Sequence, residues 1–274
     1  MPAAMILRHP AVAGRFYPAD PAVLRKEVGT YLSQPPKGAP VQALGCIVPH
    51  AGYIYSGHVA GAVFGALKIP KLCVVLCPNH TGMGRALSIM IRGLWETPLG
   101  PVIIAEDFAT ALLHYCPLLH EDSDAHRFEH AAEVELPFLQ VLQPKLGFVP
   151  VAIGTGDFEA LKQLGFALAR AITLRSEPVL IVASSDMNHY ESDAITRVKD
   201  HTAIEPILRL DARALFDVVT QQHITMCGFG PAVTMLTAAK KLGATSAELV
   251  KYATSGDVSG DRDLVVGYAG VVIR

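Results

Sequence analysis

The chain has 274 residues, a net charge of −2 and an apolar fraction of 51%, which is enough to bury a large core. Its charges are well mixed and no basic block indicates a nucleic-acid partner. No apolar run reaches the roughly 18 residues of a membrane span, and the N-terminus lacks the long apolar stretch of a signal peptide. Five scattered cysteines do not form a disulfide framework, so we expect a cytoplasmic protein without membrane contact.

The elements predicted in chain order alternate between strands and helices. Residues 1–40 form an N-terminal arm, a helix with Asp20 as its cap and Pro21 in its first turn, and a proline-rich linker over 34–40. Strands are expected at 45–50, 72–80, 86–91, 102–104, 148–153, 178–183, 247–253 and 265–273, and helices at 58–67, 107–115, 128–139, 157–172, 195–210, 211–219 and from 230. This order predicts a single α/β domain over 1–274, with a central, mainly parallel sheet flanked by helices.

Two histidines follow consecutive apolar runs. His50 comes directly after the first sheet strand and His80 after the second, and each is followed within two residues by a glycine. A hydrogen-bonded residue at a strand end is the ordinary interpretation of a single such histidine. Because sequential strands usually lie side by side, the matched pair predicts two imidazoles that face one metal ion.

A third apolar run, 179–185, leads to Asp186 and His189. Their spacing suits one helical turn, or an imidazole that works as acid or base and is oriented by the carboxylate. The alternative is that Asp186 only caps a helix. Three apolar runs that each deliver a histidine predict one polar site at one edge of the sheet.

The segment from His126 to Glu133 carries a second cluster. His126, Glu129 and His130 match the H-x-x-E-H pattern of inverted zinc metalloproteases, in which both histidines lie on one helix. On such a helix Glu133 shares a face with Glu129 and His130, and these side chains point into the same cleft or toward solvent. This pattern leaves the strand-end histidines unexplained.

Cys227 precedes a glycine-rich helix start. Backbone amides at such a start lower the pKa of a thiol and favour the thiolate that binds metals. A buried, inert cysteine is the alternative.

Together these residues resemble the Memo family, whose bacterial and archaeal members are called AmmeMemoRadiSam system protein B. The motifs that carry the resemblance are Pro49-His50-Ala51-Gly52-Tyr53-x-Tyr55-Ser56-Gly57, Pro78-Asn79-His80, Glu129-His130-x-x-Glu133, Ser184-Ser185-Asp186-x-x-His189 and Cys227-Gly228. The resemblance implies a fold like that of class III extradiol ring-cleaving dioxygenases. It also implies a metal on His50, His80 and Cys227, in a cleft lined by His130, Asp186 and His189.

From this resemblance we expect a metal-dependent oxidoreductase that uses iron(II) or copper, with zinc as a further candidate. A thiolate in place of the dioxygenase carboxylate favours softer ions, so dioxygenase activity does not follow from the fold. His189, oriented by Asp186 and assisted by His130, would handle protons, and Tyr53, Tyr55, Glu129 and Glu133 would line the substrate pocket.

Two other functions compete with this expectation. The first is a non-catalytic module that binds a small molecule or a peptide in the same cleft. The second is a zinc hydrolase built on His126, Glu129 and His130. The family resemblance also suggests radical-SAM and AMMECR-type proteins as partners.

Overall fold

The computed structural model describes residues 6–33 and 38–274. The predicted linker over 34–40 therefore lies mostly outside the described residues, as do residues 1–5 of the arm. The helices are α1 (Pro21–Leu32), α2 (Tyr53–Gly65), α3 (Glu106–Tyr115), α4 (Leu136–Leu142), α5 (Phe158–Thr173), α6 (Asp193–Leu208), α7 (Ala212–Gln221), α8 (Phe229–Lys241) and α9 (Gly256–Ser259), with a 3₁₀ turn at Asp124–His126.

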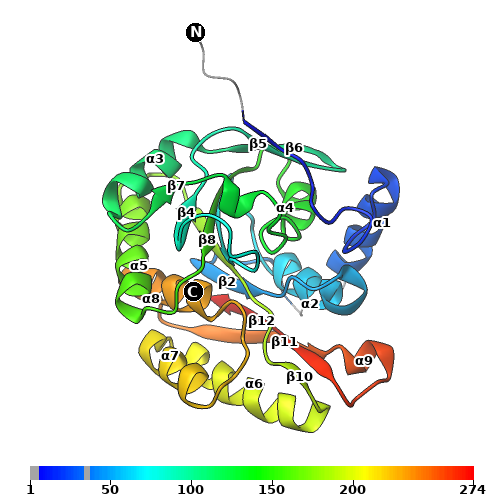
Figure 1. The fold of residues 1–274 in the computed structure, drawn as a ribbon. Coiled ribbons are helices and arrows are strands. Elements are labelled where there is room, and N and C mark those ends of the chain that lie inside the picture. Colours follow the sequence, from blue (N-terminus) through cyan, green and yellow to red (C-terminus); the bar gives the residue numbers. More distant parts are fainter. Residues whose placement is uncertain (1–5, 34–37) are drawn as a thin grey trace.

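The strands are β1 (Leu7–Arg8), β2 (Gly45–Val48), β3 (Leu72–Pro78), β4 (Leu87–Ile89), β5 (Leu94–Thr97), β6 (Gly100–Ile104), β7 (His120–Glu121), β8 (Gly147–Ile153), β9 (Val179–Ser184), β10 (His189–Glu191), β11 (Ala247–Thr254) and β12 (Val265–Ile273). All twelve belong to one sheet, whose main path runs β1-β5-β6-β8-β3-β9-β2-β12-β10 (Figure 1). The predicted fold class, a single α/β unit with a central, mainly parallel sheet flanked by helices, is confirmed.

The centre of the sheet is the parallel set β8-β3-β9-β2. These four strands are almost continuous apolar runs and nearly all their residues are buried, because helices cover both faces of the sheet. On one side α1, α2 and α4 pack together, and on the other α3, α5, α8, α7 and α6 form a continuous layer (Figure 1). Parallel strands place their carboxyl ends at one edge, where the polar residues that follow β2, β3 and β9 come together.

The strand order corrects one expectation. β2 and β3 were predicted to be neighbours, but β9 lies between them and pairs with both. After β3 the chain forms β4 to β7, then β8 pairs with one side of β3, and β9 lies on the other side of β3, between β3 and β2. The residues after β9 therefore lie between those that follow β2 and β3. In the register of this sheet, Ser184 pairs with Val48, which brings Ser184 beside His50.

Several local predictions were wrong for identifiable reasons. The helix expected over 128–139 forms only at Leu136–Leu142, and Pro137 lies in its first turn, where the missing N–H costs nothing, instead of bending its middle. The helix expected from 58 begins at Tyr53, directly after Gly52. The segment around Trp95, where no strand was expected, is the strand β5, which pairs antiparallel with β6.

The two C-terminal strands were predicted correctly as β11 and β12, which pair antiparallel. None of the helices in the described part of the chain is long and apolar enough to cross a membrane.

Candidate metal centre

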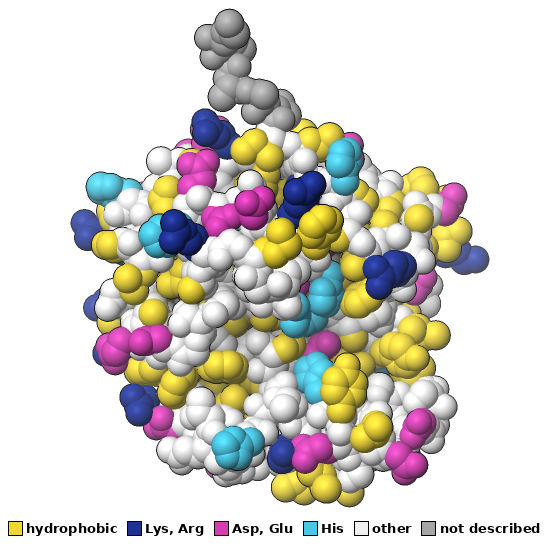
Figure 2. Space-filling model, in the orientation of Figure 1, with side chains coloured by type: hydrophobic (Ala, Val, Ile, Leu, Met, Phe, Trp, Pro, Cys, Tyr) yellow, Lys and Arg dark blue, Asp and Glu magenta, His cyan; other side chains and the backbone are white. Residues whose placement is uncertain are grey.

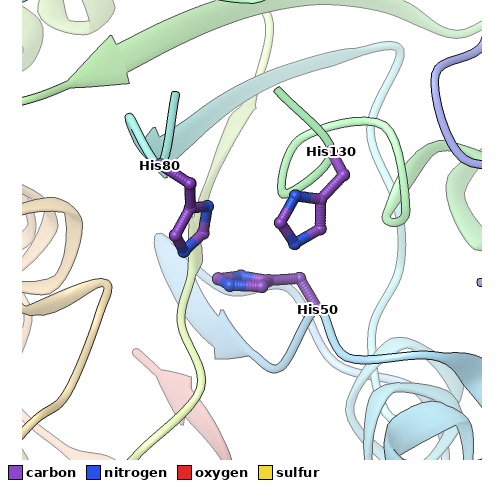
Figure 3. A group of neighbouring side chains, drawn as sticks. All are labelled: His50, His80 and His130. Atoms are coloured by element: carbon purple, nitrogen blue, oxygen red, sulfur yellow. The ribbon is translucent and has the colours of Figure 1, made fainter. Parts of the chain in front are cut away.

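Three imidazoles meet at the carboxyl edge of the sheet (Figure 3). His50, His80 and His130 each offer a ring nitrogen, and these three atoms lie within 4.8 Å of one another. The ring centroids of His50 and His80 are 5.2 Å apart, those of His50 and His130 are 5.4 Å apart, and His80 stacks on His130 at 4.8 Å. Within residues 6–33 and 38–274, this histidine cluster is the one group of three or more His, Cys, Asp or Glu side chains whose potential ligand atoms lie this close together.

The cluster is buried on one side and open on the other. His50 is 2% exposed, whereas the side chains of His80 and His130 keep 34% and 21% of their surface in contact with solvent. Histidine side chains gather near the middle of the face shown in Figure 2, with apolar side chains beside them. A ligand from solvent can therefore reach the cluster past His80 and His130.

Glu129 orients two of the three imidazoles. Its carboxylate accepts a hydrogen bond from His80 Nδ1 at 2.9 Å and lies 3.4 Å from His130 Nδ1. It also accepts from the backbone N–H groups of His80 and Ala131 at 2.6 and 2.9 Å. Because the bond to Glu129 occupies Nδ1 of His80, Nε2 is the ligand atom that this ring offers, as in many metal sites where a carboxylate fixes the histidine. The carboxylate lies beside Nδ1 of His130 and favours the same orientation there.

The pKa values of this group follow from burial and from the shared carboxylate. Burial alone would raise the pKa of Glu129, but the bonds from His80 outweigh it and keep that pKa below its ordinary value. Burial likewise opposes protonation of His80, yet Glu129 raises the net pKa of that imidazole. In His50 and His130 burial dominates and lowers the pKa, so both favour the neutral form that binds metals.

His50 is held by residues at the end of the neighbouring strand β9 and at the start of α8. Its Nδ1 lies 2.8 Å from Ser184 Oγ at the end of β9, and its backbone N–H donates to Asp186 at 2.8 Å. Its Nε2 lies 3.3 Å from Cys227 Sγ, at the start of α8. The structure thus brings Cys227 next to His50, but the ligand atoms that lie within 4.8 Å of one another belong to His50, His80 and His130 and do not include the Cys227 sulfur.

Cys227 differs from its prediction in one respect. The expected effect of the helix start was a lowered thiol pKa. Burial instead raises the pKa of Cys227 well above its ordinary value, and the bonds from the backbone near Asp186 and Gly228 do not compensate. In the metal-free protein the group is therefore a thiol.

Asp186 and His189 lie at the same edge of the sheet, but the predicted contact between their side chains is absent among the hydrogen bonds of the described residues. Asp186 binds the backbone of His50, and burial raises its pKa to about 7. His189 lies in β10, where its Nδ1 donates to the carbonyl oxygen of Thr225 at 2.9 Å and its backbone N–H donates to the Thr225 hydroxyl. Thr225, not Asp186, orients the His189 ring.

Two of the predicted pocket residues belong to the core. Tyr53 is 1% exposed and donates its hydroxyl proton to the carbonyl oxygen of Val134 at 2.7 Å. Glu133 is fully buried, and its carboxylate binds the N-terminal arm. Tyr55, in the first turn of α2, is 38% exposed. Glu129 contacts the histidines from beneath, as described above.

His126 lies outside the cluster. It is fully buried with its ring 5.8 Å from that of Trp95, and neither ring nitrogen has a hydrogen-bond partner among the described residues. Burial lowers its pKa to about 4. The zinc site of His126, Glu129 and His130 required both histidines on one helix, but residues 126–130 do not form one. The zinc-hydrolase hypothesis is therefore wrong.

Sequence reasoning missed three residues that shape the centre. Ser184 and Thr225 hold His50 and His189, and Phe16 of the N-terminal arm lies edge-on to His130 with ring centroids 4.8 Å apart. Ser184 stood inside one of the recognised motifs, so a search for hydroxyls next to strand-end histidines would have found it. Phe16 carries no comparable signal, because only the folded arm brings it to the site.

The chain is similar to known proteins over nearly its whole length. The family model described as Memo-like protein matches residues 8–272. A MEMO1 family protein from Methanopyrus kandleri is 42% identical over 97% of this chain and 99% of the relative, and another from Methanothermobacter thermautotrophicus is 40% identical over 96% and 99%. Among solved structures, an uncharacterized protein of Escherichia coli K12 shares the fold, with a TM-score of 0.52, 14% identity and coverage of 82% of this chain and 99% of that one.

Proposed function

The chain belongs to the Memo family, and on that premise we propose that it is a metal-dependent oxidoreductase with iron(II) or copper at its histidine cluster. The observation that carries the proposal is the convergence of three imidazoles, each of which offers one ring nitrogen within 4.8 Å of the other two. In each ring Nδ1 lies close to a partner, which leaves Nε2 for a ligand. Imidazole ligands suit iron, copper and zinc alike. A bound redox metal would supply electron transfer to or from a substrate.

His50 and His80 are common to both ligand sets proposed for this metal. The family resemblance adds Cys227 as the third ligand, and its sulfur lies next to His50 Nε2. The geometry of the histidine cluster adds His130. A thiolate would shift the preference toward copper(I) or zinc, and a third imidazole would keep iron(II) and copper both suitable.

The surrounding residues have roles that do not depend on which metal binds. His189 presents its free Nε2 while Thr225 holds Nδ1, so it can accept a proton from a bound substrate or donate one to it after protonation. Phe16 covers the edge of His130 and keeps water from that side of the cluster.

Metal analysis of anaerobically purified protein tests the proposal. We expect about one iron or copper per chain in the wild type, and its loss in a His50→Ala, His80→Ala double variant. The matched control is His126→Ala, which removes a buried histidine of the same chain outside the cluster and should retain the metal. Unchanged metal content in the double variant would refute the proposal.

A second candidate is a binding module that uses the same cleft without turnover. The observation in its favour is an exposed aromatic side chain next to His189: Tyr190 is 71% exposed and has a φ of 60°, a strained conformation that is common at ligand sites. Tyr190 is adjacent in sequence to His189, with ring centroids 5.6 Å apart. Peptide or small-molecule binding that is equal with and without metal would favour this candidate over the oxidoreductase.

By family resemblance we also propose a cytoplasmic location and partnership with radical-SAM and AMMECR-type proteins. Co-purification of the tagged full-length chain from its native cells under reducing, anaerobic conditions tests this partnership.

A further inference from the structure

A third glutamate lies beneath the histidine cluster, and the proposed function does not use it. Glu135 is fully buried next to the start of α4. Its Oε1 lies 2.9 Å from Ser184 Oγ, whereas its Oε2 has no hydrogen-bond partner among the described residues. No lysine, arginine or histidine of the described chain forms an ion pair with it. An ionised carboxylate in this position would be a buried charge without compensation, which is strongly unfavourable.

The hydrogen bonds of Ser184 determine whether Glu135 and His50 Nδ1 carry protons. Its hydroxyl has one proton and three neighbours: the carbonyl oxygen of Ala131 at 2.7 Å, Glu135 Oε1 at 2.9 Å and His50 Nδ1 at 2.8 Å. A carbonyl oxygen can only accept, so the shortest of these bonds takes the Ser184 proton. The other two neighbours must then donate to Ser184 Oγ, which requires a proton on Glu135 and a proton on His50 Nδ1.

We propose that Glu135 is an un-ionised carboxylic acid and that, through Ser184, it positions His50 in the tautomer that carries its proton on Nδ1. In this tautomer the lone pair of His50 is on Nε2, which faces the cluster and Cys227. Glu135 and Ser184 are therefore positioning residues for one metal ligand, as Glu129 is for the other two.

An ionised Glu135 would create an unfavourable contact at Ser184. If Glu135 were ionised, the Ser184 proton would point to it, and the lone pairs of Ser184 Oγ would then face the Ala131 carbonyl oxygen at 2.7 Å. Burial, reinforced by the nearby Asp186, raises the pKa of Glu135 well above its ordinary value, which agrees with the neutral form. A neutral acid leaves only one buried carbonyl oxygen, Oε2, without a partner, which costs far less than a buried charge without compensation.

The first test uses metal-free protein and does not depend on the proposed function. In nitrogen-15 spectra of the histidine rings we expect His50 to be protonated on Nδ1 and unprotonated on Nε2. Ser184→Ala should abolish this preference, and Ser184→Thr, which keeps the hydroxyl, should restore it. His189 is the internal control, because Thr225 fixes its tautomer in every variant. A wild-type His50 protonated on Nε2 would overturn the proposal.

The second test reads the proton on Glu135 directly. In the infrared difference spectrum of metal-free wild type and Glu135→Gln, we expect the loss of a carbonyl band of an un-ionised acid. Loss of a carboxylate band instead would overturn the proposal.

Metal affinity provides a third readout, which rests on the proposed function. Glu135→Gln keeps a donor for Ser184 and should retain wild-type affinity, whereas Glu135→Leu should lose about 10–100-fold. Circular dichroism establishes that both variants are folded, and equal affinity in two folded variants would count against the positioning role. If no variant or wild type binds metal while the His50 tautomer is as expected, the proposed function fails and the proton assignment stands.

Discussion

Glu129 and Glu133 lie four residues apart, both with fully buried side chains, yet their carboxylates serve different parts of the molecule. Glu129 accepts from His80 and Ala131 and orients the open histidine cluster. Glu133 accepts from the Ala11 and Val12 N–H groups and the Tyr17 hydroxyl, and pairs with the guanidinium of Arg8. One carboxylate prepares a site, and the other holds the N-terminal arm against the body of the protein.

The difference shows that burial alone does not assign a role to an acidic residue. The role follows from the groups that donate to the carboxylate. Imidazoles keep a second, free nitrogen that can bind a ligand, whereas a guanidinium and backbone amides offer no free ligand atom and only stabilise the fold. The two regions are still coupled, because the arm that Glu133 holds also brings Phe16 to His130.

The largest effect is expected at Glu133. Glu133→Ala leaves the guanidinium of Arg8, which is only 6% exposed, buried without its partner. Loss of one member of a buried pair costs about 3–5 kcal/mol, so we expect the free energy of unfolding in urea to fall by about that amount. The double variant with Arg8→Met removes both charges and should recover part of the stability. A loss below about 1 kcal/mol would show that the arm is held in another way.

The next largest effect on stability is expected from His126. This histidine is buried in the core, whereas His130, four residues later, belongs to the histidine cluster. The pKa of His126 is lowered to about 4 in the folded protein, against about 6.5 when unfolded. The unfolded chain therefore binds a proton first, so the stability contributed by neutral His126 is complete above pH 6.5 and is lost as the pH falls toward 4. The linkage amounts to about 3 kcal/mol.

His126→Phe should remove this part of the acid sensitivity in urea unfolding measured between pH 7 and 4, without loss of metal binding. His130→Phe should instead lower metal affinity. Equal pH profiles of wild type and His126→Phe would contradict the assignment.

Glu129→Gln tests the role of Glu129 in orienting the histidine cluster. The amide keeps the shape of the carboxylate but weakens the bond that orients His80 and removes the negative charge beside His130. We expect metal affinity to fall about 10–100-fold, or about 1.4–2.7 kcal/mol, measured by competition with a chelator. Unfolding of the metal-free variant should change less than in Glu133→Ala, and the reverse order would invert the roles assigned to the two glutamates.

The sequence allowed most of the sheet and the strand-end residues to be predicted, because parallel strands read as apolar runs and their polar successors stand out. His50 and His80 do lie in one cluster, but its third member is His130, and Cys227 contacts His50 without belonging to the group. The reason given for the two histidines, neighbouring strands, was wrong. β9 separates them, and strand order depends on long-range pairing that local patterns do not encode.

The segment 126–135 shows where a local pattern fails. The helical spacing predicted that Glu129, His130 and Glu133 share one face, directed into a cleft or toward solvent, with His126 on the same helix in the zinc-site hypothesis. These residues do not form an α-helix, and their side chains have different surroundings. His126 packs on Trp95, and Glu133 binds an arm some 120 residues earlier in the chain. Neither partner can be identified from spacing, because both contacts form only when the arm and β5 dock.

Phe16 should give the smallest effect and test the coupling of the two regions. It is half-buried and contacts His130 edge-on, so Phe16→Ala should cost about 1 kcal/mol of stability, less than a fully buried phenylalanine. Because the ring shields one edge of His130, we also expect faster modification of His130 by diethyl pyrocarbonate in metal-free protein, followed by peptide mass spectrometry. Phe16→Leu keeps most of the apolar cover and should behave like wild type. If His130 reacts at the wild-type rate in Phe16→Ala, the arm stabilises the fold without controlling access to the cluster.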